Sequence, residues 1–379
     1  MSDSLSRLGA ERLVVTYLLA GAGTDPQARA REICFEQTVE FPEDLVPAGF
    51  IRDEVIGRVE SVMEAGPGCF RAEISFPVES TARELLQLMN VVFGNISIKP
   101  GIRVERMSLP GALLRSFRGP RFGREGLRSR TKVSRRPLLC TALKPMGLAA
   151  AQLADQARQF ALGGIDLIKD DHGLTDQPYA TFSERVARCC EAVAEANART
   201  GRRCVYVPNV TGRSDHLLAR VDEARRRGAG ALLVSPFLTG LDAMRQLADD
   251  EGVALPILAH PAFGGSFVTC ATTGIAHGVL YGQLMRLAGA DASIYPNFGG
   301  RFSFTREECE AIATATAEPM GTIAPIFPAP GGGMTVDRVP DMLEVYGREF
   351  ILLMGAGLHR RGPDLAENAR FFVDLLESM

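Results

Sequence analysis

The sequence predicts an α/β protein in two parts: a small amino-terminal α+β domain of the ferredoxin-like kind and a carboxyl-terminal (β/α)8 barrel. Three observations support this prediction. The 379 residues suffice for one large domain and a smaller one. Residues 1–118 mix strand and helix patterns without long parallel runs. From residue 137 onward, short apolar runs alternate regularly with amphipathic segments.

The amino-terminal part contains the elements of a small mixed domain. In chain order we expect a strand, a helix, a strand, a helix and a short strand, at 13–20, 25–38, 70–76, 82–93 and 96–98. Residues 119–136 are rich in Arg, Gly and Pro and have little apolar periodicity, which predicts a linker. The predicted domains are therefore 1–118 and 137–379.

Eight short apolar runs typical of buried parallel strands follow the linker. They cover 138–143, 165–168, 204–207, 231–234, 256–259, 292–295, 322–327 and 350–354. Helical segments alternate with them, at 149–162, 182–199, 214–227, 240–251, 276–288, 305–318, 336–346 and 363–378. An open doubly wound sheet is the competing fold, but it usually carries G-x-G-x-x-G after its first strand, and that pattern does not follow here. The barrel is therefore predicted.

Composition excludes several classes of partner. The net charge of −3 gives no reason to expect nucleic acid or an anionic membrane. No stretch approaches the roughly 18 apolar residues of a membrane span, and residues 1–7 show no signal pattern. The eight cysteines lie in apolar runs without C-x-x-C spacing. We expect a cytoplasmic protein with reduced thiols.

A charged cluster follows the second apolar run. Lys169, Asp170, Asp171 and His172 stand in succession, at the strand end where α/β barrels place their chemistry. Four ionisable groups at the mouth of a dry strand are costly unless they are paired. A divalent metal, a substrate or mutual ion pairing would each provide partners. A solvated strand end with a Lys–Asp pair is the simplest alternative.

Other strand ends add polar side chains to the same mouth. Lys144, Asn209 and His260 follow the first, third and fifth strands, and the loop after the sixth strand carries Arg301 and is long enough to act as a lid. Lys144 would act as a base if it is partly desolvated, or would pair with an aspartate of the cluster. His260 either takes part in the chemistry at the barrel mouth or is a neutral, hydrogen-bonded core histidine.

Glycine-rich turns follow the last two strands, at Gly331–Gly333 and at Gly355 and Gly357. Glycine lets backbone N–H groups approach an anion closely, and the loops after strands seven and eight are the usual phosphate site of barrel enzymes. We therefore expect a phosphorylated ligand. Lys169 would alternatively take up CO2 as a carbamate, which together with Asp171 offers Mg²⁺ the oxygen ligands that it prefers.

Taken in order, these motifs resemble the RuBisCO large-subunit family over nearly the whole chain. The matching stretches are Lys144-Pro145, Gly163–Asp171, His260, Gly289–Asp291, the loop with Arg301, Gly331–Pro340 and Gly355–Gly357. In the smaller domain, Phe35–Gln37 and Val92–Asn95 look like that family's active-site glutamate and asparagine segments. So many motifs in one order are far more specific than any single motif.

The resemblance implies a homodimer or larger homo-oligomer whose active sites form between one subunit's barrel and the other's smaller domain. It also implies a role for each matching residue. Lys144 is the base that enolises the substrate, and His260 and Arg301 lie near the substrate. The metal ligands are the carbamylated Lys169, the carboxylate of Asp171 and, at a third ligand position, His172. Glu36 and Asn95 come from the partner subunit, and the phosphate-binding backbone is that of Gly332, Gly333, Gly355 and Gly357.

Several departures from the family pattern argue against CO2 fixation on ribulose bisphosphate. His172 stands where the family has a metal-binding glutamate, which weakens the expected Mg²⁺ site. Pro261 replaces the arginine after the strand-five histidine, and Met146 replaces a second lysine. The strand-six histidine that would help hold a second phosphate is replaced within Ser293–Tyr295, and the lid lysine is Arg301. The chain resembles a RuBisCO-like protein that binds one phosphate.

We expect an enzyme that forms an enolate, because a metal or cationic groups stabilise the developing oxyanion. The first expectation is a lyase or C–C hydrolase in carbohydrate breakdown that decarboxylates, transcarboxylates or hydrolyses a substrate of the 3-oxo-isoapionate 4-phosphate type. A β-keto acid loses CO2 into the same enolate without a second phosphate anchor. The alternative is an enolase or isomerase of a methylthio-ketose phosphate in methionine salvage, with an apolar pocket from Met146, Phe263, Tyr295 and Phe298. Outside catalysis, the alternative is a sugar-phosphate-binding regulator, which His172 favours.

Overall fold

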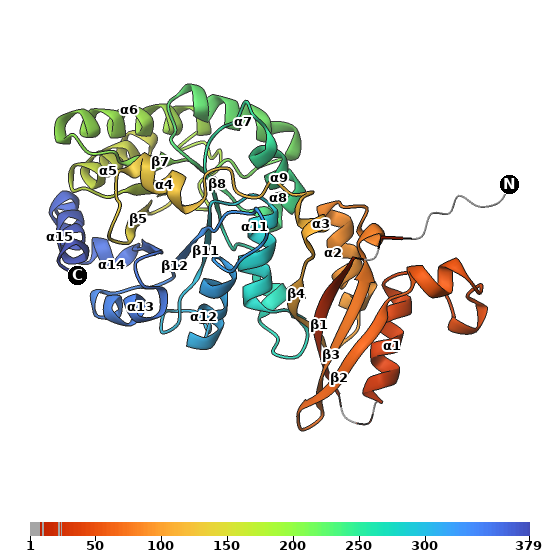
Figure 1. The fold of residues 1–379 in the computed structure, drawn as a ribbon. Coiled ribbons are helices and arrows are strands. Elements are labelled where there is room, and N and C mark those ends of the chain that lie inside the picture. Colours follow the sequence, from red (N-terminus) through yellow and green to blue (C-terminus); the bar gives the residue numbers. More distant parts are fainter. Residues whose placement is uncertain (1–7, 10, 22, 24) are drawn as a thin grey trace. The chain divides into compact units, whose positions relative to one another are not determined.

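Figure 1 shows the computed structural model of the chain, which describes residues 8–9, 11–21, 23 and 25–379. The chain divides into two units. The first unit consists of Met1–Arg118, Gly264–Gln283 and Pro319–Ile323, and the second of Gly119–Phe263, Leu284–Glu318 and Ala324–Met379. Two short segments of the range 137–379 therefore belong to the first unit.

The first unit contains a five-stranded sheet with the order β10-β4-β1-β3-β2. Its strands are β1 Arg12–Ala20, β2 Arg58–Gly66, β3 Cys69–Pro77, β4 Ile102–Ser108 and β10 Gly274–Ile275. β1 pairs antiparallel with β3 and β4, β2 pairs antiparallel with β3, and β10 lies parallel to β4. Buried and half-buried side chains alternate along β1, as in a sheet with one covered face. The longer helices of this unit are α1 Pro26–Glu36, which packs against β2 and β3, and α2 Leu85–Phe93.

Two elements of the first unit differ from the sequence-based expectation. Residues 96–98 form part of a 3₁₀ helix, Asn95–Ile98, instead of a strand. Ser97 N–H donates to Gly94 O, and Gln37 Oε1 accepts from Ile96 N–H, so the backbone turns instead of extending. The sequence does not predict β2, because none of the side chains of this strand is buried and its hydrophobic pattern is weak.

The second unit contains eight parallel strands that occur in the order of the chain. They are β5 Leu138–Leu143, β6 Leu167–Asp170, β7 Val205–Val207, β8 Leu232–Val234, β9 Ile257–Ala259, β11 Ala292–Pro296, β12 Phe327–Gly331 and β13 Ile351–Leu353. They form two four-stranded sheets, β13-β5-β6-β7 and β12-β11-β9-β8. A parallel bridge between Asn209 and Leu233 joins β7 to β8, and β13 pairs back onto β5. This arrangement confirms the predicted (β/α)8 barrel.

Helices alternate with these strands and surround them (Figure 1). The principal helices are α5 Ala150–Leu162, α6 Phe182–Thr200, α7 Ser214–Arg226, α9 Leu241–Asp249, α11 Met285–Leu287, α12 Arg306–Ala315, α13 Val339–Tyr346 and α15 Leu365–Ser378. Short helices follow two of the strands: α8 Pro236–Thr239 after β8 and α14 Ala356–His359 after β13. The barrel interior is filled by apolar side chains that alternate along the strands, among them Cys140, Leu167, Val207, Leu233, Leu258, Ile294, Ala329 and Ile351.

The segment 119–136 is more ordered than the expected linker. It contains helix α4, Gly123–Thr131, and Leu127 of this helix is fully buried in the barrel core. Asp291 Oδ1 accepts hydrogen bonds from Phe122 N–H at 2.8 Å and from Gly123 N–H at 2.6 Å, which fixes the start of α4. Only one position of the helix needs to be apolar to reach the core, so the sequence shows little periodicity there.

Two strands are shifted relative to their predicted ranges. β6 begins at Leu167 and includes Lys169 and Asp170. Just before it, the carboxylate of Asp166 accepts hydrogen bonds from Arg136 and from the N–H of Leu139. β12 begins at Phe327 instead of 322, since residue 322 lies in a turn and residues 323–326 have no regular structure. These shifts matter because each residue of a strand faces the side opposite to its neighbour.

The cysteines are free thiols, and six of the eight are buried, whereas Cys69 is half-buried and Cys270 is exposed. Across the described part of the chain, no helix combines the length and apolar composition that crossing a bilayer requires.

Candidate active site

The carboxylate of Asp171 connects two strand ends at the barrel mouth. Lys144 Nζ, just beyond β5, forms an ion pair with Asp171 Oδ2. Asp171 Oδ1 accepts from Gly173 N–H at 3.0 Å and lies 3.1 Å from His172 Nδ1. The Asp171 side chain is 6% exposed and that of Lys144 is 41% exposed, so the amine is the group open to a substrate. Burial acts to raise the pKa of Asp171, but hydrogen bonds from His172, Lys144 and Gly173 outweigh it and hold that pKa well below its usual range.

Asp170, the neighbouring carboxylate, has a different environment. It is fully buried. Its carboxylate accepts hydrogen bonds from Arg185 Nε at 3.1 Å, the Tyr206 hydroxyl at 2.7 Å and Asn209 N–H at 3.0 Å. Because side chains alternate along a strand, Asp170 faces helix α6 while Lys169 and Asp171 face the barrel interior. The lysine–aspartate pair left open by the sequence is therefore Lys144 with Asp171.

Lys169 lies deeper in the barrel than Lys144. Its side chain is buried, and Nζ donates to the carbonyl oxygen of Asp170 at 3.1 Å. Burial lowers the pKa of Lys169, although the nearby carboxylate of Asp171 acts in the opposite direction. A lowered pKa increases the share of neutral amine, which is the form that reacts with CO2.

His260 lies beside this cluster and stacks on His172. The two ring centroids are 4.3 Å apart and the ring planes differ by 13°. Ala262 N–H donates to His260 Nδ1 at 3.2 Å, so the neutral ring carries its proton on Nε2. Burial, together with Lys169 and His172, lowers the pKa of His260 to about 2. His260 is therefore a neutral hydrogen-bond donor placed at the mouth.

Two further polar groups lie in this region that the sequence does not single out. Ser235 directly follows β8 and is buried, and its hydroxyl has no hydrogen-bond partner within the described residues. The pairing of Val234 with Ala259 places Ser235 beside His260. His359 of α14 has a buried Nε2 that likewise lacks a partner there, and burial and Lys144 lower its pKa.

Strand register would have identified Ser235, because it follows the fourth strand just as His260 follows the fifth. His359 has no such signal, since it lies in a short helix beyond the strand.

Asn209, which follows the third strand as expected, holds the loop after β6 in place. Its amide donates to the carbonyl oxygens of His172 at 2.8 Å and Leu174 at 3.0 Å.

The glycine turn after β12 is connected to the loop that carries Arg301. Gly332 and Gly333 have φ values of +90° and +100°, in the region that favours glycine. Arg301 N–H donates to Gly332 O at 2.9 Å, and a Cβ at Gly333 would lie 3.3 Å from Arg301 N. The Arg301 guanidinium lies 4.9 Å from the ring centroid of Phe302, and Arg301 is exposed. A side chain at Gly333 would therefore crowd this loop.

The turn after β13 approaches Lys144. A Cβ at Gly355 would lie 3.9 Å from Lys144 Cε, and one at Gly357 would lie 2.5 Å from Met334 O. Gly355 thus leaves open space beside Lys144, while Gly357 is required by close packing against the turn after β12. The structure therefore brings the expected phosphate-binding loops next to one another and next to Lys144.

The apolar residues expected to line a thioether pocket separate into two groups. Tyr295 is buried on the outer side of β11, where its ring packs against Tyr346 of α13, and Phe298 lies 5.7 Å from the Arg306 guanidinium. Neither residue is open to the mouth. Met146 is 46% exposed, and Phe263, just after β9, is also exposed. A Cβ at Gly173 would lie 2.4 Å from Met146 Sδ, so Met146 borders the loop that carries Asp171.

The donor set at the mouth can be compared with what Mg²⁺ requires. Among the described residues, no group of three or more His, Cys, Asp or Glu side chains is arranged to hold a metal ion. A carbamate on Lys169 would add a second anionic oxygen ligand to Asp171, and His172 would supply an imidazole. These residues fit Mg²⁺ through two oxygen ligands and offer a weaker third one.

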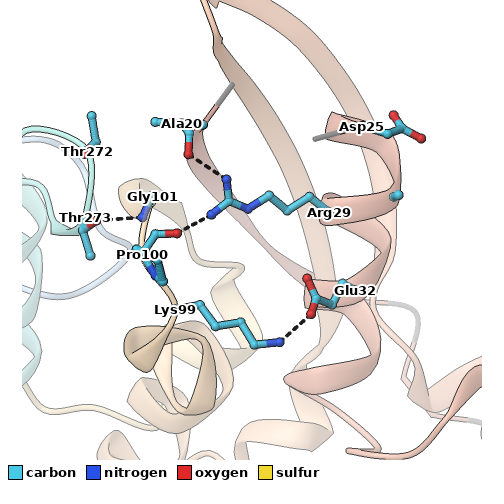
Figure 2. A pocket seen from close by; sticks show the side chains of 11 residues that line it. Ala20, Asp25, Arg29, Glu32, Lys99, Pro100, Gly101, Thr272 and Thr273 are labelled. Atoms are coloured by element: carbon cyan, nitrogen blue, oxygen red, sulfur yellow. Dashed lines mark hydrogen bonds and ion pairs between the residues drawn. The ribbon is translucent and has the colours of Figure 1, made fainter. Parts of the chain in front are cut away.

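In the first unit, the structure brings Glu36 and Asn95 together. Asn95 Nδ2 donates to Glu36 Oε1 at 3.1 Å, and Glu36 Oε2 lies 3.7 Å from Lys99 Nζ. Lys99 also lines a cavity of about 950 Å³ between helix α1 and the segment around Gly101 (Figure 2).

The charged groups of this cavity are paired within the unit. Lys99 Nζ contacts Glu32 at 2.6 Å, and the Arg29 guanidinium donates to the carbonyl oxygens of Ala20 and Pro100, as Figure 2 shows. Because these cations already have partners, the cavity does not present an additional anion site.

Comparison with protein families identifies relatives of this chain along most of its length. Residues 125–364 match the family described as the ribulose bisphosphate carboxylase large chain, catalytic domain. Ribulose bisphosphate carboxylase-like protein 1 of Rhodopseudomonas palustris is 40% identical over 96% of this chain and 97% of its own. The 5-methylthioribulose-1-phosphate isomerase of Rhodospirillum rubrum is 38% identical over 96% of each chain.

Solved structures of the RuBisCO family also resemble this chain. A Rubisco-like protein from Rhodopseudomonas palustris superposes with a TM-score of 0.87 at 39% identity, over 97% of both chains. The octameric ribulose-1,5-bisphosphate carboxylase/oxygenase of Pyrococcus horikoshii superposes with a TM-score of 0.90 at 26% identity, over 99% of this chain and 90% of that one.

Replacing Arg185 with leucine should destabilise the protein by about 3–5 kcal/mol, because it leaves the buried carboxylate of Asp170 without its cation. Arg188→Leu is the matched control on the same helix. Arg188 pairs with Glu184 at the surface, and its loss should change the free energy of unfolding by less than about 0.5 kcal/mol. Urea unfolding measures both. Equal effects of the two substitutions would contradict the role given to Asp170.

Proposed function

Because the chain belongs to the RuBisCO large-chain family, we propose that it is a RuBisCO-like enzyme that isomerises a methylthio-ketose monophosphate through an enediolate. The observation that carries this proposal is the half-exposed Lys144 amine, held by Asp171 beside the glycine turn at Gly355. The 38% identity to an enzyme named 5-methylthioribulose-1-phosphate isomerase, along nearly the full length of both chains, supports the substrate class.

This proposal replaces the first expectation from the sequence. Decarboxylation or hydrolysis of a branched 3-oxo sugar acid phosphate uses the same enolate. The names of two of the similar chains, an isomerase and an enolase, nevertheless favour the expected alternative, an enolase or isomerase of a methylthio-ketose phosphate. They also favour an enzyme over a sugar-phosphate-binding regulator.

Isomerisation requires that a proton leave the carbon beside the ketone and return to a neighbouring carbon. Lys144 is the amine open to the substrate, and in its neutral form it would take this proton and then give it back. A Mg²⁺ ion held by Asp171 and a carbamate on Lys169 would polarise the ketone and compete with Lys144 for the carboxylate. The Nε2–H of neutral His260 would donate to the oxyanion that develops in the enediolate.

Recognition of a single phosphate fits the distribution of charge at the mouth. The backbone of Gly332, Gly333, Gly355 and Gly357 would hold the phosphate. A second phosphate would need the basic side chains that Met146 and Pro261 replace. The exposed Met146 instead gives an apolar contact suited to a thioether. Glu36 and Asn95 would complete the site from the partner subunit of a homodimer.

Lys144→Ala should lower the kcat for 5-methylthioribulose 1-phosphate by at least about 100-fold, because it removes the group that moves the proton. Binding of the substrate phosphate should change little. Lys144→Arg is the companion variant. It keeps the charge beside Asp171 but does not release a proton near neutral pH, so it should also be inactive. Loss of substrate α-proton exchange with D2O, followed by NMR, checks both variants, and turnover at the wild-type rate in either would exclude Lys144 as the base.

Gly333→Ala should raise the KM for the phosphorylated substrate by about tenfold or more, because the added methyl group meets Arg301 and disturbs the turn. Gly228→Ala is the control. Gly228 has a similar φ of +93° but has no atom within 4 Å of an added Cβ, so it carries the same backbone strain away from the mouth. Steady-state kinetics distinguishes them, and an unchanged KM for Gly333→Ala would place the phosphate elsewhere.

A further inference from the structure

A second cavity in the barrel unit lies at the end opposite to the mouth. It has a volume of about 880 Å³ and is lined by four segments and the end of α15. The segments are 131–136, 164–166, 201–204 and residue 348, which precede strands β5, β6, β7 and β13, respectively. The cavity therefore lies at the amino-terminal ends of the strands, whereas Lys144, Asp171 and His260 lie at the carboxyl-terminal ends.

The lining of this cavity is strongly basic. Its basic side chains are Lys132, Arg135, Arg136, Arg202, Arg203 and Arg348, and its acidic side chains are Asp166 and Glu377. Arg136 forms a two-pronged pair with Asp166 at 2.6 and 2.9 Å, and Arg348 donates to Met379 O. The side chains of Lys132, Arg135, Arg202 and Arg203 form no ion pair or hydrogen bond within the described residues. Four cations thus face one cavity without protein partners.

The base of the cavity is formed by a buried ion pair, which distinguishes it from an ordinary solvated surface. The ion pair of Arg136 and Asp166 is buried, with both side chains less than a tenth exposed. Asp166 Oδ2 also accepts from Leu139 N–H at 2.8 Å. Arg202 lies directly over Gly164: a Cβ at that position would be 2.8 Å from its guanidinium. The absence of a side chain at Gly164 leaves room for Arg202, which is exposed in the cavity wall, as are Lys132, Arg135 and Arg203.

Helix ends account for only part of this positive charge. Lys132 is the C-cap of α4, and Arg202 and Arg203 follow Gly201, the C-cap of α6. The carboxyl-terminal end of a helix carries about half an elementary negative charge, which favours nearby cations. Four unpaired cations exceed what these two helix ends would neutralise.

We propose that this cavity binds a small anion that carries two or more phosphoryl groups. Arginine guanidinium groups match phosphate oxygens with paired hydrogen bonds, and three of the four unpaired cations are arginines. The volume lies within the range of small-molecule sites, which is about 300–1,000 Å³. One phosphate would meet only some of these cations, whereas a chain of phosphoryl groups reaches several. The site is separate from the catalytic mouth and binds its ligand independently of the substrate.

Tripolyphosphate, titrated calorimetrically into the full chain at low ionic strength, tests this proposal. The double variant Arg202→Ala/Arg203→Ala should raise the Kd at least tenfold. The control is Arg225→Ala/Arg226→Ala, an adjacent arginine pair on α7 that is already paired with Asp222. It removes the same charge and should change the Kd less than twofold. The melting temperature without ligand shows that both variants are folded.

A third variant separates the two ends of the barrel. Gly333→Ala, which alters the mouth, should leave tripolyphosphate binding within twofold of wild type. Binding that fails in Gly333→Ala but persists in Arg202→Ala/Arg203→Ala would place the anion at the mouth and overturn the proposal. Equal weakening by both arginine pairs would show attraction to net charge alone, and no binding by the wild-type chain would overturn it as well.

Discussion

The buried carboxylate of Asp170 sets the orientation of strand β6. Arg185, Tyr206 and the N–H of Asn209 hold it toward helix α6. Because successive side chains of a strand face opposite sides, this outward anchor turns Lys169 and Asp171 inward. The anchor is specific, because a buried carboxylate that loses its cation costs several kcal/mol. A shift of one residue along β6 would turn Asp171 toward helix α6 and Asp170 toward the mouth.

The same strand is held by charge at its other end. Asp166 accepts two hydrogen bonds from Arg136 and one from Leu139 N–H just before β6 begins. The strand thus lies between two buried ion pairs, Arg136–Asp166 at its start and Arg185–Asp170 at its end. The charged groups between them are used differently: Asp171 holds Lys144, and Lys169 stays buried with a lowered pKa. This division explains how four consecutive ionisable residues occupy one strand end.

The sequence predicts the barrel well because its strands are short, apolar and regularly spaced, and the structure confirms all eight. It predicts less about individual side chains. The predicted run 165–168 placed Lys169 and Asp170 after the strand, and only the structure shows that both belong to it. The helix at Leu127 escaped notice because a single apolar residue anchors it.

The site shows the same limits. Lys144, Asp171 and His260 are recognisable as strand-end residues, and the structure brings them together. Tyr295 is also near a strand end. Side chains alternate along β11, and because Ile294 faces the barrel interior, Tyr295 faces Tyr346 outside it and points away from the mouth. Ser235 directly follows the predicted run 231–234, so the sequence offered a signal for it, whereas His359 lies in a short helix beyond its strand and offered none. Register, which depends on pairing between strands, is what the sequence alone does not supply.

The central claim is that two adjacent aspartates have separate tasks, one in the fold and one in the chemistry. Comparing Asp170→Asn with Asp171→Asn, by kcat for 5-methylthioribulose 1-phosphate and by urea unfolding, tests it most directly. Asp171→Asn should lose about 100-fold or more in kcat. Its loss of unfolding free energy should be smaller than that of Asp170→Asn, because its partner Lys144 is 41% exposed and stays hydrated when the carboxylate is removed. Asp170→Asn should lose about 3 kcal/mol of stability while the folded protein still turns over substrate. The reverse pattern, or the same loss of both properties in both variants, would contradict the account.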